Sequence, residues 1–462
     1  MSAMQLRLTK RADVNMTDGP IVPQIINFSI PIILGMLFQQ LYNTVDTWVV
    51  GNFVGKNSFS AVGTLSPVTN LAISFFMGFS SGASVIISHY FGANDKENLS
   101  KANHTFVATT LILCVVLTLL GMALIPLLLT ILKSPTEVAY EQSIYLTIYF
   151  GGISGLLIYN MGSAILRAVG DSSHPFLFLV VSAVLNIILD LLFVIPFKMG
   201  TAGVAYATVL SQFISAILVF WVLFKTKSVV RLSIKKLKID PTMLIKIFRI
   251  GLPSALQMSI TSFSNVFVQS YINYFGTDVM GGWTAYNKVD QLVLLPMQSI
   301  AFATQTFVGQ NLGTDKTERA RKGVSACLYL SLASTAVLIA LIIPASRYIV
   351  RFFIGSGEEG VIRYGAMFLT YLTPFYLLPC FNQIYAGALR GAGKPAIPMA
   401  AMLGSFVLFR QIYLFVMASY ISNTIMPIAL GYPAGWLLCS IAMIAAYKVC
   451  FTDERLRKSS IV

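Results

Sequence analysis

Long apolar runs separated by short polar segments recur along the whole chain. A helix needs about 20 consecutive apolar residues to cross the hydrocarbon core of a bilayer, and twelve runs meet that length. The pattern therefore predicts an all-α integral membrane protein with twelve transmembrane helices. The predicted spans cover residues 23–50, 58–90, 102–130, 138–161, 174–196, 201–224, 246–275, 283–308, 321–346, 362–386, 396–421 and 424–448.

The composition excludes an ordinary soluble protein. Of the 462 residues, 56% are hydrophobic and 11% are charged, whereas about 25% are charged in a typical soluble domain. The five cysteines lie in or beside apolar runs, and the three histidines are scattered. Because the spans contain neither a metal-ligand spacing nor a nucleophile–base set, we expect a protein that is not an enzyme and has no cofactor.

The basic residues fall mainly on one side of the predicted topology. Twelve spans place both termini on the same side, and 24 of the 32 Lys and Arg residues belong to the termini and the even-numbered loops, against 6 in the odd-numbered loops. Cytoplasmic loops carry such an excess. The sequence therefore predicts that both termini are cytoplasmic, and the net charge of +14 requires no nucleic-acid partner.

The two halves of the chain resemble one another at an offset of 221 to 223 residues. Pro31 corresponds to Pro253, Asn43 to Asn265, and the sequence LRAVG at 166–170 to LRGAG at 389–393. Each half has six predicted spans, an even number, so both enter the membrane from the same side. We therefore predict two six-helix bundles related by a pseudo-twofold axis along the membrane normal, as in alternating-access transporters.

The densest basic segment lies at the midpoint of the chain and includes IKKLK at 234–238. We interpret it as a topology determinant that links the two halves. The predicted organisation has five parts: a cytoplasmic N-terminus (1–22), an N-terminal six-helix lobe (23–224), a basic cytoplasmic linker (225–245), a C-terminal six-helix lobe (246–448) and a cytoplasmic C-terminus (449–462).

Apart from Glu141 in the first turn of its span, three acidic residues, Asp46, Asp190 and Asp290, lie inside predicted spans. An ionised Asp near a helix centre costs about 2.5–3.5 kcal/mol on insertion scales, so such residues are usually functional. Asn186 shares a helix face with Asp190, and Thr208 follows in the next span. Two carboxylates, an amide and a hydroxyl suit Na⁺ or a proton shared between acids. We predict a cation-coupling site at Asp46, Asn186, Asp190 and Thr208, and expect no other metal.

The first span carries a polar face beside the same acid. Gln39, Asn43 and Asp46 are spaced as i, i+4 and i+7, and Tyr42 lies one helical turn before Asp46. Gln39, Tyr42, Asn43 and Asp46 therefore share one polar face of the helix. Pro31 interrupts the hydrogen-bond ladder of this helix and permits a kink, so we predict a hinge there.

The second half keeps a polar stripe but has no acid at the corresponding positions. Asp46 corresponds to Val268 and Asp190 to Tyr413 at the repeat offset, so ion coupling is expected in the N-terminal lobe alone. We predict that Gln257, Asn265 and Met297 contribute to the substrate cavity, since methionine surfaces suit loose, polyspecific binding.

Three further charges remain inside the second half. Lys288 and Asp290 are two residues apart, which places them on different faces of a helix. They are interpreted as an interfacial or interlobe polar pair, with a second coupling site as the alternative. Arg410 lies deeper, and it requires either a partner or a water-filled cleft.

Several motifs, in a fixed order, resemble the MATE (multidrug and toxic compound extrusion) transporters. The resemblance extends over about residues 20 to 450, and each motif alone is modest. The matching segments are LYNTVD at 41–46, HYFGA at 89–93, LRAVGD at 166–171, NIILD at 186–190, GVAYAT at 203–208, VGQNLG at 308–313 and LRGAG at 389–393.

The resemblance implies antiport of Na⁺ or H⁺ against amphipathic, mostly cationic drugs and dyes. It implies that Asp46, Asn186, Asp190 and Thr208 form the cation site of the N-terminal lobe. It also implies that Gln39, Tyr42 and Asn160 lie near the drug cavity, and we expect Asn43, on the same helix face, to border this substrate cavity. One branch of the family uses a glutamate in the seventh span and an aspartate in the tenth. Neither acid is present here, which argues against a cation site of that type in the C-terminal lobe.

The sequence leaves several alternatives open. A lipid-linked precursor flippase or a polysaccharide exporter of the same superfamily is the nearest rival, although such clefts tend to be strongly basic. The choice between Na⁺ and H⁺ is not decided, because oxygen ligands serve both. We expect a multi-pass protein of a bacterial cell membrane, surrounded by lipid, and a monomer.

Overall fold

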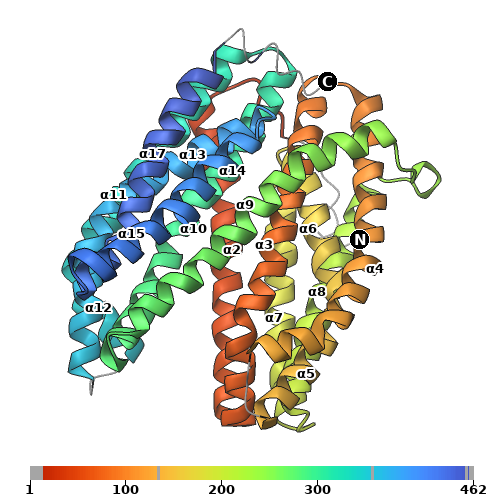
Figure 1. The fold of residues 1–462 in the computed structure, drawn as a ribbon. Helices are drawn as coiled ribbons and strands as arrows, with labels where there is room; N and C mark the ends of the chain where they lie inside the picture. The colour runs from red at the N-terminus through yellow and green to blue at the C-terminus, as the bar shows by residue number, and fades with distance from the viewer. Residues whose placement is uncertain (1–13, 133–135, 355–357, 453–455, 457–462) are drawn as a thin grey trace. The chain divides into compact units, whose positions relative to one another are not determined.

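The computed structural model describes residues 14–132, 136–354, 358–452 and Leu456. The N-terminal and C-terminal parts expected from the sequence therefore fall partly outside the described residues. Every regular element in the described ranges is a helix (Figure 1). The chain forms two compact units: unit 1 consists mainly of Ile30–Leu252, and unit 2 of Met16–Ser29 with Pro253–Val462.

Unit 1 is built from helices that match the first six predicted spans. In it, α7 packs along α8, and α6 lies against both α8 and α3. The elements are α2 (Ile21–Val49), the π-helical turn η1 (Val50–Val54), α3 (Lys56–Gly92), α4 (Lys96–Leu132), α5 (Thr136–Gly151), α6 (Ile153–Ala168), α7 (Ser173–Val194), α8 (Gly200–Lys225) and the short 3₁₀ helix η2 (Ile234–Lys236).

Unit 2 repeats the plan with more interruptions. Its central helix α10 packs against α11, α12 and α13. The elements are α9 (Pro241–Asn273), α10 (Thr277–Gly313), α11 (Thr317–Ile354), α12 (Glu359–Leu372), η3 (Thr373–Tyr376), α13 (Leu377–Gly391), α14 (Ala396–Met402), η4 (Leu403–Phe409), α15 (Arg410–Val416), η5 (Met417–Ile421), α16 (Ile425–Ala429) and α17 (Gly431–Cys450).

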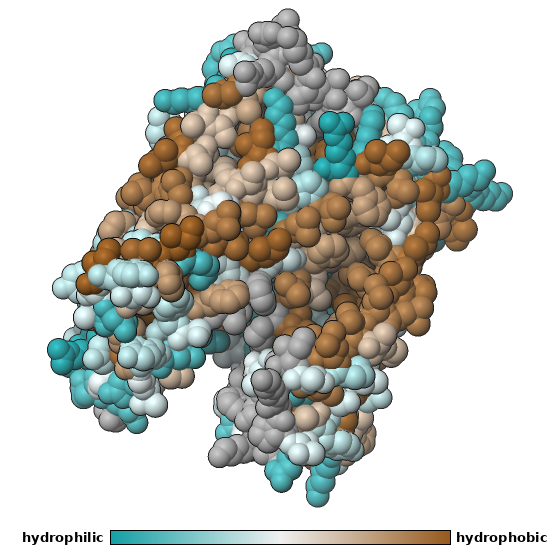
Figure 2. Space-filling model, viewed as in Figure 1, coloured by the Kyte–Doolittle hydropathy of each residue, from teal (hydrophilic) through white to brown (hydrophobic). Residues whose placement is uncertain are grey.

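The helices have the length and polarity of membrane spans. Within the described residues, ten helices are long and apolar enough to cross a membrane, or eleven if the bent pair α5–α6 counts as one span. The remaining predicted span, 362–386, corresponds to α12 and α13 with the 3₁₀ turn η3 between them. Apolar side chains cover the middle of the helices, and polar ones gather near helix ends (Figure 2). The all-helical membrane fold is confirmed.

Two predicted spans are wrong in detail. The span predicted at 138–161 is two helices that meet at 45°, and the second continues to Ala168. The chain breaks where two glycines are adjacent, since Gly151 ends α5 and Gly152, with φ −105° and ψ 6°, precedes α6. In the span predicted at 362–386, Pro374 follows the first residue of the 3₁₀ turn.

Two helices are shared between the units. The first part of α2, through Ser29, belongs to unit 2, and the rest belongs to unit 1. The first part of α9, through Leu252, belongs to unit 1, and the rest belongs to unit 2. Each change of unit falls within two residues of a proline inside the helix, Pro31 or Pro253.

The first part of α9 lies very close to α3 inside unit 1. A Cβ atom on Gly82 would come within 2.5 Å of the Gly251 nitrogen and 2.8 Å of the Ile250 carbonyl carbon. Glycine at position 82 permits this approach of the two backbones, as small residues do between membrane helices. Nearby, Lys246 Nζ on α9 donates a hydrogen bond of 3.0 Å to the Tyr90 hydroxyl on α3.

The segment before α2 is attached to unit 2 by hydrogen bonds to α10 and α11. Met16 is 1% exposed, and its N–H donates to Gln310 Oε1 at 2.9 Å. Its carbonyl accepts hydrogen bonds from Asn311 Nδ2 and from Arg319 Nη2, each at 3.2 Å. Arg319 also donates to Gln24 Oε1 at 3.2 Å. The first turn of α2 is thereby attached to the ends of α10 and α11.

The basic linker is bound to unit 1 by the start of α4. Asn103 Nδ2 donates to the Val230 carbonyl at 2.8 Å, and the Ser233 N–H donates to His104 Nε2 at 3.1 Å. The Asp240 N–H donates to the adjacent Thr105 hydroxyl at 3.0 Å. Three consecutive, buried residues of α4 thus hold the linker between α8 and α9.

Candidate functional site: a buried carboxyl pair in unit 1

Helices α2, α7 and α8 meet in unit 1 through a small apolar cluster. Val49 and Val50 pack with Val194 of α7 and Val204 of α8, and Val45 lies at the edge of this cluster. Asp46 follows Val45 directly, Asp190 lies one turn before Val194, and Thr208 lies one turn after Val204. The packing of the valines therefore brings the predicted polar residues of the three helices to the same height along the helix axes.

The two acids of this region lie side by side. The carboxyl groups of Asp46 and Asp190 are within hydrogen-bonding reach of one another. Asp190 is 0% exposed, and Asp46 is half-buried with its Oδ1 atom fully shielded. Because two ionised carboxylates at this separation repel, such a pair favours a shared proton or a bound cation.

The polar atoms around the pair lack partners in the described part of the protein. Both carboxylate oxygens of Asp190, the Oδ1 atom of Asp46, and the amide oxygen and nitrogen of Asn186 are buried and accept or donate no hydrogen bond there. Asn186 is 1% exposed. Buried polar groups in proteins are nearly always satisfied, so this concentration of unsatisfied atoms indicates a place for a bound species.

Thr208 completes the predicted set. It is buried, and its hydroxyl donates to the Val204 carbonyl of its own helix at 3.0 Å, which leaves the oxygen available as an acceptor. The donor set is thus carboxylate, amide and hydroxyl, all of which are hard ligands. No group of three or more His, Cys, Asp or Glu residues that could hold a metal occurs within the described ranges.

Two tyrosines of α5 that the sequence pattern does not single out lie near the acids, together with the predicted Tyr42. Tyr145 and Tyr149 of α5 stack with ring centroids 6.0 Å apart. Tyr145 lies close enough to Asp46 and Asp190 to interact electrostatically with both carboxyl groups. Tyr42 interacts with Asp46 as well. In the sequence, only their spacing of four residues marks Tyr145 and Tyr149 as neighbours on one helix.

The other predicted residues of unit 1 lie on the same helices. Gln39 is half-buried on α2 and hydrogen-bonds to Tyr42, and Asn43 is exposed. Asn160 is buried, and its amide donates to the Leu156 carbonyl of α6 at 2.9 Å. Their roles in substrate binding remain predictions.

The polar stripe of unit 2 is internally satisfied, in contrast to the acid site of unit 1. Gln257 accepts a hydrogen bond of 3.4 Å from Arg390 Nη1, and Asn265 Oδ1 accepts one of 2.8 Å from Arg410 Nη2. Met297 is buried and belongs to the hydrophobic core of the unit. These contacts occupy the side chains within the unit, and a place for them in a substrate cavity stays a prediction.

The remaining charges of unit 2 do not pair as the sequence suggested. Asp290 Oδ1 accepts a hydrogen bond of 2.7 Å from the Tyr376 hydroxyl, whereas Lys288 is exposed. No ion pair joins these two side chains in the described structure, because a separation of two residues places them on different helix faces. Arg410 finds its partners in neutral groups and in the Tyr432 ring, 4.7 Å from the guanidinium carbon.

Comparison with known proteins identifies the family. The MatE family model matches residues 31–192 and matches again over residues 253–416. The chain belongs to the MatE family. The two matches begin at Pro31 and Pro253, the two prolines that the internal repeat of this MatE protein places in correspondence.

Relatives of this MatE chain cover nearly its whole length. The probable multidrug resistance protein YpnP of Bacillus subtilis (strain 168) is 30% identical over 433 residues, 94% of this chain and 96% of that protein. The multidrug export protein MepA of Staphylococcus aureus (strain NCTC 8325 / PS 47) is 21% identical over 393 residues, 84% of this chain and 86% of that protein. A crystal structure of MATE in complex with MaL6 superposes with a TM-score of 0.91 at 24% identity, covering 97% of this chain and 100% of that one.

Proposed function

We propose that this MatE protein is a secondary active multidrug efflux antiporter. It exports amphipathic, mostly cationic compounds in exchange for H⁺ or Na⁺ by alternating access. The membership of the family and the names of the relatives support multidrug export. The exchange itself rests on one observation, the adjoining carboxyls of Asp46 and Asp190 among buried polar atoms that have no partner in the described structure.

The coupling ion binds at this carboxyl pair. A proton is held between the two carboxyl oxygens, or Na⁺ is held by the carboxylates with the Asn186 amide oxygen and the Thr208 hydroxyl. Either ion removes the repulsion between the acids and satisfies buried atoms, so its binding stabilises one arrangement of α2, α7 and α8. An ion that binds one arrangement more tightly shifts the population toward it.

Helix α2 transmits the change. Its first part, through Ser29, belongs to unit 2, while the part that carries Asp46 belongs to unit 1, so a rearrangement of the units acts on both parts of α2. Pro31 lies beside this change of unit and cannot donate a backbone hydrogen bond, so bending of α2 is least costly there. Ion binding at Asp46 thereby couples to the angle of α2 at Pro31 and to release of the exported compound.

The gradient supplies the driving force. A tenfold gradient of the coupling ion is equivalent to about 1.4 kcal/mol, and a transmembrane potential adds about 2.3 kcal/mol per elementary charge per 100 mV. One cation exchanged for a monovalent cationic compound moves no net charge, so the chemical gradient alone drives that exchange. Neutral compounds gain from the potential as well.

We propose that the protein is a multi-pass monomer of a bacterial cell membrane with both termini in the cytoplasm. The excess of Lys and Arg in the even-numbered loops supports this orientation. The apolar surface along the helices contacts membrane lipid.

Export of a lipid-linked precursor or a polysaccharide is a second candidate, favoured by two buried arginines in unit 2. Arg390 and Arg410 are 5% and 2% exposed. Arg410 Nε has no hydrogen-bond partner in the described structure, so an anionic group of a substrate would bind there. Both guanidinium groups already bind neutral side chains of the unit, which favours the first candidate.

The test uses proteoliposomes and ethidium as the probe. Efflux is measured with an imposed pH gradient and, separately, with an imposed Na⁺ gradient, and the gradient that drives transport identifies the ion. Asp46→Asn removes one carboxylate of the pair and is expected to reduce gradient-driven efflux at least tenfold. Asp278→Asn, at an exposed acid in the first turn of α10, is the matched control and is expected to transport normally.

Two results would contradict the proposal. Unchanged efflux by Asp46→Asn, with the protein correctly inserted, removes the carboxyl pair from the coupling step. Failure of the wild-type protein to move the dye under either gradient would favour the second candidate.

A further inference from the structure

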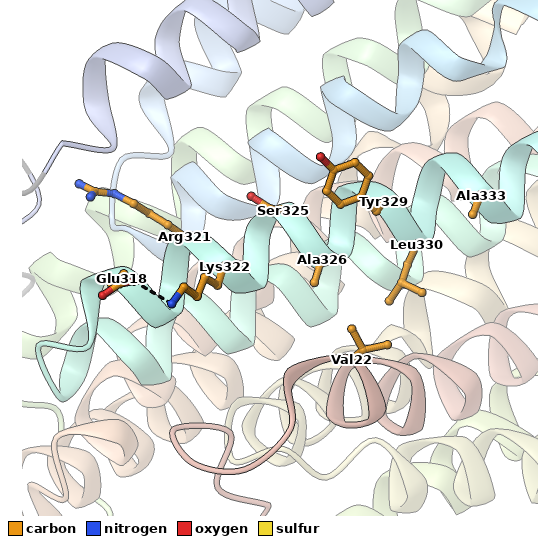
Figure 3. A pocket seen from close by; sticks show the side chains of 9 residues that line it. All are labelled: Val22, Glu318, Arg321, Lys322, Ser325, Ala326, Tyr329, Leu330 and Ala333. Atoms are coloured by element: carbon orange, nitrogen blue, oxygen red, sulfur yellow. Dashed lines mark ion pairs between the residues drawn. The ribbon is translucent and has the colours of Figure 1, made fainter.

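A groove with a cavity volume of about 620 Å³ lies beside α11 in unit 2 (Figure 3). One wall is the exposed face of α11, on which Lys322, Ser325 and Tyr329 recur at helical spacing. The opposite wall includes Val22 from the first turn of α2, which faces Leu330 across the groove. All of these residues belong to the same compact unit.

The polarity of the groove changes along the helix. Its charged residues, Glu318, Arg321 and Lys322, lie in the first two turns of α11. Beyond Ser325, the lining on both walls is apolar apart from the Tyr329 hydroxyl. A basic end that continues into an apolar channel matches the chemistry of an amphiphile with an anionic head.

The length of α11 places the charged end at the membrane surface. The helix has 38 residues, which at 1.5 Å per residue gives about 57 Å, whereas the hydrocarbon core is about 30 Å thick. The first turns therefore extend beyond the core to the level of the lipid headgroups. The apolar part of the groove lies next to the acyl chains.

We propose that this groove binds an anionic phospholipid, with the phosphate at Arg321 and Lys322 and an acyl chain along Ala326, Tyr329 and Leu330. Basic pockets at the cytoplasmic side of membrane helices recognise anionic headgroups in this way. The orientation follows the topology given under Proposed function, which places this end of α11 at the cytoplasmic leaflet.

The two basic side chains leave neighbouring sides of the first turns of α11 and are held differently (Figure 3). Arg321 Nε donates to the Phe451 carbonyl at 3.1 Å, which fixes the position of the guanidinium group. Lys322 pairs with Glu318 at 2.7 Å, but the two side chains are 67% and 79% exposed. Exposed ion pairs are weak because water screens them, so a phosphate displaces Glu318 from Lys322 at little cost.

Lipid in the groove also bears on the attachment of α2. Val22 belongs to the segment that Arg319 and Lys316 bind through Met16, Gln24 and Asp18. A lipid that contacts Val22 on one side and α11 on the other joins the two walls. Bound lipid is therefore expected to reduce opening of this segment away from unit 2.

The experiment measures binding to the full-length protein in detergent through the shift of its apparent melting temperature. The probes are dioctanoyl phosphatidylglycerol, dioctanoyl phosphatidylcholine and inorganic phosphate, each titrated separately. Phosphatidylglycerol is expected to bind at least about tenfold more tightly than phosphatidylcholine, because each basic residue near an anionic headgroup contributes about 1 kcal/mol. Inorganic phosphate at the same concentrations is expected to give no shift.

Variants locate the site. Arg321→Gln with Lys322→Gln is expected to remove the preference for phosphatidylglycerol. Lys235→Gln with Lys236→Gln, which removes two exposed lysines from the linker of unit 1, is the matched control and is expected to keep the preference. Glu318→Gln is expected to strengthen phosphatidylglycerol binding, which tests the site without relying on a loss of function.

Three results would overturn the proposal. The first is equal binding of the two lipids by the wild-type protein. The second is a preference that persists in the Arg321 and Lys322 double variant or disappears equally in the linker control. The third is competition by inorganic phosphate at the concentration of the lipid, which would identify a site for small anions in which the acyl chain plays no part. None of these outcomes depends on transport, so the lipid proposal and the proposed antiport are tested independently.

Discussion

The close approach of α9 to α3 makes Gly82→Ala the most direct test of the packing in unit 1. The added methyl group would lie 2.5 Å from the Gly251 nitrogen, whereas ordinary contacts are 3.4–4 Å. The two backbones must therefore separate by about 1 Å. Movement of α9 is resisted on the N-terminal side of this point, because the Asp240 N–H is bonded to Thr105 and Lys246 to Tyr90.

The expected effect follows from two opposing terms. Overpacking of this kind lowers the free energy of unfolding by about 1–3 kcal/mol. The higher helix propensity of alanine offsets up to about 1 kcal/mol of this loss. We expect a net loss of about 1–2 kcal/mol in the free energy of unfolding, and a lower apparent melting temperature in detergent.

Gly63→Ala is the matched control on the same helix. A Cβ atom at Gly63 meets nothing within 4 Å, so only the propensity term applies and the stability is expected to rise slightly or stay constant. If Gly82→Ala melts at the same temperature as Gly63→Ala and transports dye equally well, the argument from backbone contact is refuted.

Three further predictions concern polar contacts. Asn186→Ala is expected to leave the melting temperature unchanged but to weaken the response of efflux to the coupling gradient, because the amide has no partner to lose in the described structure. Asn103→Leu leaves the buried Val230 carbonyl without its donor and is expected to cost about 1–3 kcal/mol, measured as faster hydrogen exchange in the linker. The Lys316 ammonium, by hydrogen bond and charge, holds the pKa of the Asp18 carboxyl below its usual range, so this contact stabilises the docked segment above the pKa of the undocked carboxyl and is lost as pH falls through the lowered value. Asp18→Asn should therefore increase exchange near Met16 at neutral pH and match the wild type in acid, and a constant difference at all pH values would contradict this.

The sequence predicted the spans well where a single uninterrupted helix crosses the membrane. It failed where the apolar pattern continues through a break, because hydropathy carries no information on backbone direction. The glycine pair at 151–152 bends one predicted span, and the 3₁₀ turn at Thr373–Tyr376 divides another. Neither interruption changes the average polarity of its surroundings.

The candidate site was predictable in part for a similar reason. A carboxylate inside an apolar run is conspicuous, so hydropathy alone is enough to select Asp46 and Asp190. Tyr145 is one of 20 tyrosines, and only the packing of α5 places it beside the acids. The partners of Gln257 and Asn265 are arginines more than a hundred residues away in the chain, and periodicity within one helix cannot identify them.

The division of α2 and α9 between the units has a consequence for how such a chain can arise and be dissected. A cut in the linker yields two halves, and neither contains a whole compact unit: the first half lacks Pro241–Leu252, and the second lacks Met16–Ser29. Each half supplies the other's missing piece, as protomers do in a segment-swapped dimer. Two separate copies of one repeat, divided in this way, would complete each other's compact units only by exchanging these segments.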